Sequence, residues 1–213
     1  MDLGRPISTV IPSLDGAVLG VLARTTRLIS GRQVHRLAGT GSEAGVRLVL
    51  NRLSKTGLVH VHDAGNSLLY TLNRRHLAAA AVLQLADLRQ RFIAILSEEI
   101  GQWEVQPLHA SLFGSAARGD GTVESDVDLL LVRSDYQDEL DMRWQEQLVM
   151  LAELIDARTG NRAQMYDLSA GGLRKHVSTG EAIVDEWRRD AITLIGFDFP
   201  ALLRKIAVAE GDT

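Results

Sequence analysis

The sequence predicts a mixed α/β (α+β) fold in two modules, because both charge and hydrophobic pattern change near residue 75. Residues 1–75 hold ten Lys and Arg against four Asp and Glu, a net charge of +6, whereas the remaining residues hold 13 against 23, a net charge of −10. Apolar residues follow helical spacing in the first part, while strand-like and helical runs alternate in the second. This alternation indicates a sheet covered by helices. Opposite charges indicate modules with different partners.

The composition is ordinary for a soluble globular protein: of 213 residues, 46% are hydrophobic and 23% are charged. No apolar run approaches the ~20 residues that a membrane helix needs. The first residues lack the basic and apolar regions of a secretory signal. The absence of cysteine excludes disulfides and thiolate metal sites. We therefore expect a cytoplasmic protein with no membrane partner.

The first module is predicted over residues 1–76 and begins with two short helices. Apolar residues at helical spacing predict a helix over residues 17–24. Ser30 can cap a second helix over residues 31–38, and Gly39 can end it. The two helices therefore precede a short turn.

A third helix and a β-hairpin follow that turn. Thr40 with Glu43 forms a capping-box pattern, and Gly57 can end the third helix. Two strand-like runs then flank Gly65-Asn66, which is a hairpin signal. Helix, helix, turn, helix and hairpin is the order of a winged helix, in which the helix after the turn is the recognition helix. The module resembles bacterial regulators of the MarR/ArsR general type.

Basic and polar residues on these helices make double-stranded DNA a candidate partner. Arg47, Asn51 and Ser54 form a stripe on the third helix that suits base edges and phosphates. Arg32 and Arg36 lie on the helix before it. The positive charge of the module favours DNA. A winged helix can instead serve as a docking or dimerisation module, and a homodimer would suit paired DNA half-sites.

Residues 77–103 are predicted to form one long connector helix. The segment is rich in Ala and Leu, contains no Pro and has its only Gly near its end. The remaining residues, 104–213, form the second module. We expect strands over Leu108–Phe113, Val127–Val132 and Arg162–Leu168, with a long helix over residues 136–158 before the last of them.

Two acids mark the start of the second strand in this module. Asp126 and Asp128 are two residues apart, so their side chains project to the same face of a strand. Carboxylates this close repel each other, which is costly beside an apolar core unless a cation lies between them. Mg²⁺ prefers such oxygen ligands together with substrate phosphates. The alternative interpretation is a solvated strand end without a ligand.

The pair Gly114-Ser115 follows the first strand of the same module. Gly allows close backbone approach to a ligand, and the Ser hydroxyl with nearby backbone N–H groups can hold a phosphate. A phosphate-binding turn and a carboxylate pair, separated by a short loop, suggest a nucleoside triphosphate with its metal.

These motifs together resemble a known family. Gly114-Ser115, Ala117-Arg118-Gly119 and Ser125-Asp126-Val127-Asp128-Leu129 are similar to the signature of the minimal nucleotidyltransferases, which belong to the DNA polymerase β-like nucleotidyltransferase superfamily. The likeness covers the chain clearly from Leu108 to Asp167. The segment over residues 181–196 resembles, less specifically, the helix and strand that close the core of these small enzymes.

The resemblance implies roles for individual residues. Asp126 and Asp128 would hold Mg²⁺ or Mn²⁺, and Gly114 with Ser115 would bind the phosphates. A third carboxylate is expected on a following strand, near the acceptor hydroxyl, as a metal ligand or general base. Asp167 is the candidate because it is the only acid between Asp156 and Glu181. Arg118 would either reach a phosphate or pair with a carboxylate.

The resemblance therefore implies a metal-dependent enzyme that moves a nucleoside monophosphate, most simply AMP, from an NTP to an acceptor hydroxyl. The acceptor leaves no motif: it can be a protein, an RNA or a small molecule such as an antibiotic. The competing hypothesis is a winged-helix transcription regulator that binds nucleotide without turnover. A transferase fold that has lost its activity is the other alternative, because a fold does not guarantee function.

Overall fold

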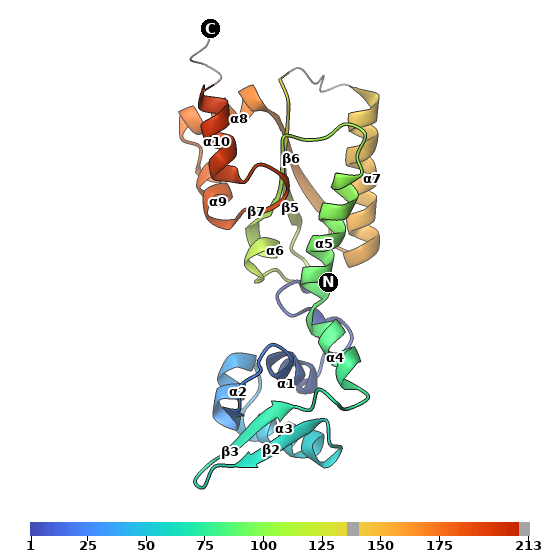
Figure 1. The fold of residues 1–213 in the computed structure, drawn as a ribbon, viewed down its shortest axis with the longest axis vertical. Helices are drawn as coiled ribbons and strands as arrows, with labels where there is room; N and C mark the ends of the chain where they lie inside the picture. The colour runs from blue at the N-terminus through green and yellow to red at the C-terminus, as the bar shows by residue number, and fades with distance from the viewer. Residues whose placement is uncertain (136–140, 209–213) are drawn as a thin grey trace. The chain divides into compact units, whose positions relative to one another are not determined.

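The computed structural model describes residues 1–135 and 141–208 of the chain (Figure 1). It divides into two compact units. The N-terminal unit is Gly4–Arg89 together with Asp2, and the C-terminal unit is Gln90–Thr213 together with Met1 and Leu3.

The N-terminal unit contains short helices and an antiparallel sheet. Its strand order is β1-β3-β2, and Gly65 lies in the tight turn between β2 and β3 with φ +77°. The predicted hairpin is therefore confirmed, and a short strand that the sequence did not indicate is added to it. The elements are a 3₁₀ helix η1 (Pro6–Thr9), α1 (Leu14–Ala23), β1 (Ile29–Ser30), α2 (Gly31–Ala38), α3 (Glu43–Lys55), β2 (Val59–Asp63), β3 (Leu68–Leu72) and α4 (Ala79–Ala86).

Two caps fix α2 and α3. The Ser30 side chain accepts a hydrogen bond from the Gln33 backbone N–H, the Gln33 side chain returns one to Ser30, and Gly39 ends α2 in the left-handed conformation. The predicted second helix is thus confirmed. The predicted cap of the third helix is wrong, because Ser42 and not Thr40 accepts from the Gly45 N–H. Both residues are good caps in sequence, and the chain uses the one nearer the helix.

One hydrophobic core holds the N-terminal unit together. Apolar side chains from α1, α2, α3, α4 and the sheet meet there, with Val18, Leu22 and Leu50 fully buried. On α3 the buried face is Val46, Val49, Leu50 and Leu53, which leaves the opposite face of that helix exposed. Helical spacing of apolar residues therefore decides which face of α3 is available to a partner.

The C-terminal unit is a mixed sheet between two layers of helices. The strand order is β6-β5-β4-β7, where β5 and β6 are parallel and the other neighbours are antiparallel. Its elements are α5 (Leu88–Gly101, from Gln90 on), β4 (His109–Phe113), α6 (Gly114–Arg118), β5 (Val127–Arg133), α7 (Met142–Thr159), β6 (Ala163–Ser169), α8 (Ala170–Thr179), α9 (Ala182–Asp190), β7 (Ile192–Gly196) and α10 (Phe199–Val208).

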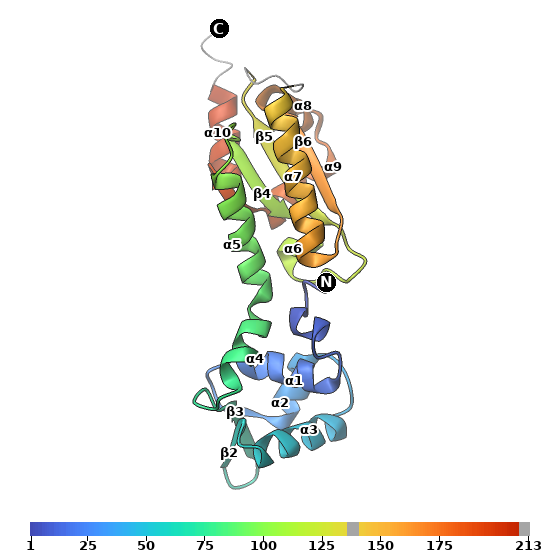
Figure 2. The ribbon, with the colours of Figure 1, turned by 90° about the vertical axis from the view of Figure 1, so that its right-hand side faces the viewer.

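The two faces of this sheet bury separate cores. Helices α5 and α7 cover one face, and α8, α9 and α10 cover the other (Figures 1 and 2). Along β5, Leu129 and Leu131 pack towards α5 and α7, whereas Leu130 and Val132 pack towards α8, α9 and α10. The strand is apolar throughout because both of its faces are covered.

Two predicted helices differ from the structure. The connector predicted over residues 77–103 is two helices, α4 and α5, with Asp87 as the C-cap of α4. The break separates Val82, which packs in the core of the N-terminal unit, from Leu96, which packs in the core of the C-terminal unit. The helix predicted over residues 136–158 begins at Met142 with Asp141 as its cap, and residues 136–140 lie outside the described part.

Across residues 1–135 and 141–208, no helix has both the length and the apolar character that crossing a membrane requires.

Candidate functional site

The turn between β4 and α6 brings backbone and carboxylate into close contact. Gly114 follows the last residue of β4 and has φ +64°. A Cβ at position 114 would lie 2.3 Å from Oδ2 of Asp128. Both the backbone conformation and the space therefore require glycine, which is the residue that allows the Asp128 carboxylate to lie against the turn.

Asp126 and Asp128 stand at the start of β5. Asp128 is half-buried and pairs with Phe113 of β4 on one side and with Gln164 of β6 on the other. Asp126 directly precedes the strand and is exposed. Asp126 is near enough for its negative charge to act on Asp128, so the structure places the two predicted carboxylates in one region.

The electrostatic environment of Asp128 disfavours its charged form. Burial, and then the negative charges of Asp126 and Glu186, raise the pKa of Asp128 to about 6, while the charge of Arg118 opposes them. Within the described residues, neither Asp126 nor Asp128 forms a hydrogen bond or ion pair through its carboxylate. Two adjacent carboxylates without partners, one of them half-buried, form a donor set that fits a hard divalent cation.

The loop that leads to Asp126 is held by a residue that the sequence did not reveal. Asn161 is 2% exposed, and its side-chain amide donates to the Ser125 carbonyl oxygen at 2.9 Å. Within the loop, the Thr122 N–H donates to Ser125 Oγ at 2.9 Å. The signal available was only an Asn directly after Gly160, the glycine that ends α7. We therefore assign Asn161 to positioning the loop and not to binding a ligand.

Ser115 lies at the start of α6 with its hydroxyl available. Its carbonyl oxygen accepts from the N–H groups of Gly119, Asp120 and Gly121 at 2.9, 3.1 and 3.2 Å. Its hydroxyl forms no hydrogen bond with the described residues. Because α6 has only five residues, its helix dipole adds little. Phosphate binding here would depend on the Ser115 hydroxyl and local backbone donors.

Arg118, which the sequence assigned either to a phosphate or to a carboxylate, pairs with carboxylates. Its Nη1 donates to Asp190 Oδ2 at 2.6 Å and its Nε to Asp120 Oδ2 at 3.2 Å. The hydrogen bonds to Asp190 and Asp120 raise the pKa of Arg118, and those from Arg189 and Arg118 lower the pKa of Asp190. Arg118 thus ties α6 to α9, the helix that ends at Asp190.

The structure does not bring Asp167 to the carboxylate pair. Asp167 lies beside Leu131 in the β5–β6 ladder, three positions beyond Asp128, and on the opposite face of the sheet. Its Oδ2 accepts a hydrogen bond from Trp144 Nε1 at 3.0 Å, and its Oδ1 is 3.4 Å from Arg133 Nε. The expected three-carboxylate cluster is therefore not formed, and the residue of β6 beside Asp128 is Gln164.

No metal-ligating group of three or more His, Cys, Asp or Glu occurs among residues 1–135 and 141–208. The predicted site thus comprises Gly114, Ser115, Asp126 and Asp128 around one end of β5. Glu186 of α9, which no motif in the sequence marks, adds a further negative charge that acts on Asp128.

The sequence-predicted DNA-binding residues lie on α2 and α3 of the N-terminal unit. Arg32, Arg36, Arg47 and Asn51 are exposed. Ser54 is half-buried, and its hydroxyl donates to the Leu50 carbonyl oxygen of its own helix at 2.8 Å. Four of the five predicted side chains therefore face solvent, and the fifth has its donor engaged.

Comparison with known proteins agrees with the geometry of the C-terminal unit. A family model described as polymerase beta, nucleotidyltransferase matches residues 97–188. This match supports the nucleotidyltransferase superfamily. The matched segment contains Gly114, Ser115 and the Asp126–Asp128 pair, and the family suggests transferase activity with an NTP as substrate. Searches of curated proteins and of solved structures gave no match.

Proposed function

We propose that the C-terminal unit is a metal-dependent nucleotidyltransferase that moves a nucleoside monophosphate, AMP in the first instance, from an NTP to an acceptor hydroxyl. The observation that supports this most directly is the Asp126–Asp128 pair. The pair has no partner within the described residues, Asp128 lies against Gly114, and both acids fall inside the segment that the family model matches. Carboxylates without partners beside a glycine turn destabilise the folded protein, whereas a divalent cation with bound phosphates would neutralise their charge.

In this proposal each residue has one task. Asp126 and Asp128 would hold Mg²⁺ or Mn²⁺, which when bound neutralises charge on the phosphates. The Ser115 hydroxyl would donate to a phosphate oxygen, and Gly114 keeps side-chain atoms out of that space. The acceptor hydroxyl oxygen would form a bond to the α-phosphorus while the bond from that phosphorus to the bridging oxygen of the β-phosphate breaks. The hydroxyl proton would pass to solvent, and pyrophosphate would leave. Catalysis would depend on positioning and charge neutralisation.

Two assignments made from sequence change. Arg118 is engaged by Asp190 and Asp120, so we assign it to holding α6 against α9 and not to a phosphate. Asp167 faces the α5–α7 side, so we assign it to the core beside Trp144.

Nucleotidyl transfer itself is the test. The full chain is incubated with each α-labelled NTP and Mg²⁺ or Mn²⁺, with the protein itself, bulk tRNA, DNA, aminoglycosides and a cell lysate as separate acceptor arms. We expect label on one acceptor class, and its loss with Asp128→Asn. Label that persists at wild-type level in Asp128→Asn would overturn the site. Nucleotide binding without label in any arm would favour the regulator that binds nucleotide without turnover.

For the N-terminal unit we propose a winged helix that binds double-stranded DNA. The order α1, β1, α2, α3, β2, β3 is the order of that fold. Among the described residues, Arg32, Arg36 and Arg47 form no ion pair, so their charges are available for phosphates. Paired half-sites would be bound by a homodimer.

A matched pair on α3 tests DNA binding. Arg47→Ala should weaken binding by roughly 1–3 kcal/mol and reduce its salt dependence. Arg52→Ala is the control, because Arg52 on the same helix is already paired with Asp15. Equal, small effects of both substitutions would favour a docking role for this unit.

A further inference from the structure

Helix α9 is fixed to the same end of β5 as the carboxylate pair. Trp187 of α9 is fully buried, and its ring meets the Phe113 ring edge-on with centroids 6.2 Å apart. Phe113 precedes Gly114 and lies beside Asp128 in the sheet. At the C-terminal end of α9, the Asp190 side chain is 4% exposed and accepts from Arg118 of α6. Both anchors hold α9 against the turn that forms the site.

These anchors determine where Glu186 lies. Glu186 and Asp190 are four residues apart, so they share one side of α9. Asp190 contacts Arg118 on that side, which therefore faces α6. Glu186 is half-buried, and its negative charge acts on Asp128. The helix thus places a carboxylate on the side of α9 that faces α6, where its charge acts on Asp128. Glu186 is about 60 residues beyond the pair in the chain, and neither spacing nor motif in the sequence relates the two.

The acids around this turn divide into two groups by their partners. Asp120 and Asp190 accept hydrogen bonds from Arg118, and Asp190 also accepts from Arg189 at 2.8 Å. Asp126, Asp128 and Glu186 form no hydrogen bond or ion pair among the described residues. Arg118 and Arg189 form no ion pair with these three acids, but their charges offset part of the negative charge, because Arg118 acts on Asp128 and Glu186 acts on Arg189.

We propose that Glu186 supplies the third carboxylate of the divalent-cation site, acting on the cation through its water shell and not as a direct ligand. The indirect role follows because the described acids form no group of three at ligating distance. Mg²⁺ keeps several waters when one or two carboxylates hold it, so an outer carboxylate has hydrogen-bond donors to accept from. Glu186 would be a positioning residue and would take the role of third carboxylate that was expected of Asp167 from the sequence. This inference rests on the proposed function of the Asp126–Asp128 pair.

Mn²⁺ binding to the full chain tests the proposal without needing the acceptor. The affinity is measured by titration calorimetry and by the loss of the free Mn²⁺ electron paramagnetic resonance signal. We expect Glu186→Gln to weaken Mn²⁺ binding by roughly 10-fold, the lower end of the effect of outer-shell partners. Glu186→Asp, which keeps the charge, should lose less. Thermal unfolding of each variant checks that the fold is kept.

Asp185→Asn is the matched control. Asp185 neighbours Glu186 on α9, but its side chain is 77% exposed and pairs with Arg188 at 3.3 Å on the solvent side. The Asp185→Asn substitution removes one negative charge next to Glu186 in the chain but on the solvent side, so we expect wild-type Mn²⁺ affinity. Equal weakening by Asp185→Asn and Glu186→Gln would mean that only net charge matters and would overturn the specific role of Glu186.

Asp128→Asn separates this inference from the function on which it rests. Wild-type Mn²⁺ affinity in Glu186→Gln, with strong loss in Asp128→Asn, would overturn the role of Glu186 and leave the proposed cation site standing. Wild-type affinity in both variants would remove the cation site itself, and the inference with it.

Discussion

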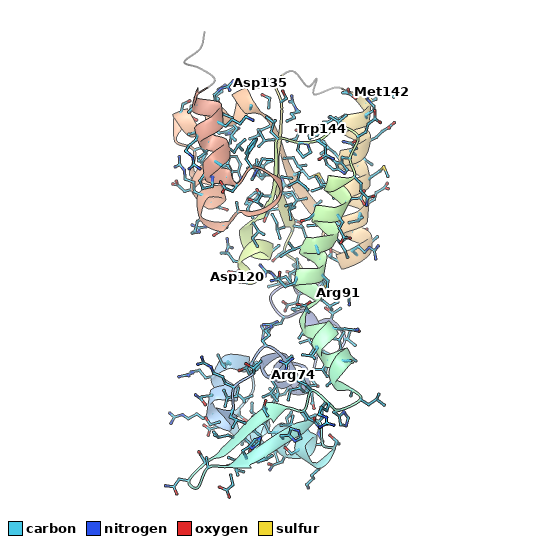
Figure 3. The ribbon with its side chains drawn as sticks, in the orientation of Figure 1. Arg74, Arg91, Asp120, Asp135, Met142 and Trp144 are labelled. Carbon is cyan, nitrogen blue, oxygen red and sulfur yellow. The ribbon has the colours of Figure 1, made fainter. Side chains whose placement is uncertain are left out.

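The two ends of the parallel pair β5–β6 contain the same kind of side chain in opposite circumstances. At one end Asp126 and Asp128 have no partner among the described residues. At the other end Asp135 accepts from the Gly171 N–H at 2.6 Å and from Arg174 at 2.8 Å. Asp167, which lies inside β6 beside Leu131, accepts from Trp144. Figure 3 labels Asp120 in the loop after α6 and Asp135 at the opposite end of the sheet.

The pKa values follow the same division. Burial, Asp126 and Glu186 raise the pKa of Asp128 to about 6. Burial alone would also raise the pKa of Asp135, but the Gly171 N–H and the Arg174 guanidinium lower it below its usual value. Carboxylates whose charge is satisfied by the protein hold elements together. Carboxylates whose charge is left unsatisfied cost stability and are available to a ligand.

The largest difference between the ends should appear on Asp128→Asn. We expect at least about 100-fold loss of Mn²⁺ affinity and of nucleotidyl transfer, more than an outer-shell partner would cause. The reason is that the amide removes one of the two charges that would face the cation in the proposed site. Calorimetry and the labelled-NTP assay measure both effects, and a loss of less than about threefold in each would contradict the difference between the ends.

Asp167→Ala should have the opposite profile. Removing this carboxylate takes away the acceptor of the Trp144 N–H and the charge beside Arg133, with the Asp167 side chain only 18% exposed. We expect a loss of about 2–3 kcal/mol in the free energy of unfolding, measured in urea. Mn²⁺ affinity of the folded protein should stay within about twofold. Lost Mn²⁺ binding with stability unchanged would restore Asp167 to the site.

Without metal, Asp128→Asn should stabilise the protein. The folded-state pKa of Asp128 is about 6, above its ordinary value of 3.8, so its contribution to stability is present below that ordinary value and is lost as pH rises through 6. At pH 7 the substitution should therefore raise the free energy of unfolding by roughly 1–2 kcal/mol, after allowance for solvent screening. The gain should vanish near pH 4, and wild-type Mn²⁺ affinity should rise with pH through about 6. Urea unfolding in chelator at both pH values measures the effect.

The smallest effect is expected for Asp135→Asn. This side chain binds the Gly171 N–H and Arg174 in α8, but it is exposed enough for water to solvate both partners when its charge is removed. The expected loss is below about 1 kcal/mol in the free energy of unfolding, with no change in Mn²⁺ binding. A larger loss would show that this end of the sheet depends on the ion pair more than its exposure implies.

Local signals in the sequence predicted much of this fold. Apolar spacing and caps located α2, and alternating runs with Gly65-Asn66 located the β2–β3 hairpin. The Asp126–Asp128 pair could be predicted to project to one side because a period of two is a property of one strand. Each of these features depends on residues close together in the chain.

The structure places Asp167 away from the Asp126–Asp128 pair, because the side on which it lies depends on the register between two strands. Asp128 lies beside Gln164, so the residues of β6 that share its side are Gln164, Tyr166 and Leu168. If the register between β5 and β6 were shifted by one residue, Asp167 would lie on that side. The identity of the residue does not determine this register. Asn161 and Glu186 act from outside the motif, and neither has a local pattern that marks it. The prediction of one continuous helix over residues 77–103 was wrong because the residues on both sides of Asp87 favour helix, so propensity does not indicate the break.

The position of β7 at the edge of the sheet has a practical consequence for anyone preparing a smaller protein. The family match ends at residue 188, whereas β4 is hydrogen-bonded to β7 at residues 192–196, and Phe199 and Leu202 of α10 are buried in the core that includes Trp187. A fragment cut at the end of the match would expose one edge of β4 and the apolar face beneath α10. Such an unpaired edge is a template for intermolecular strand pairing, so the fragment should precipitate where a fragment that extends through α10 stays in solution.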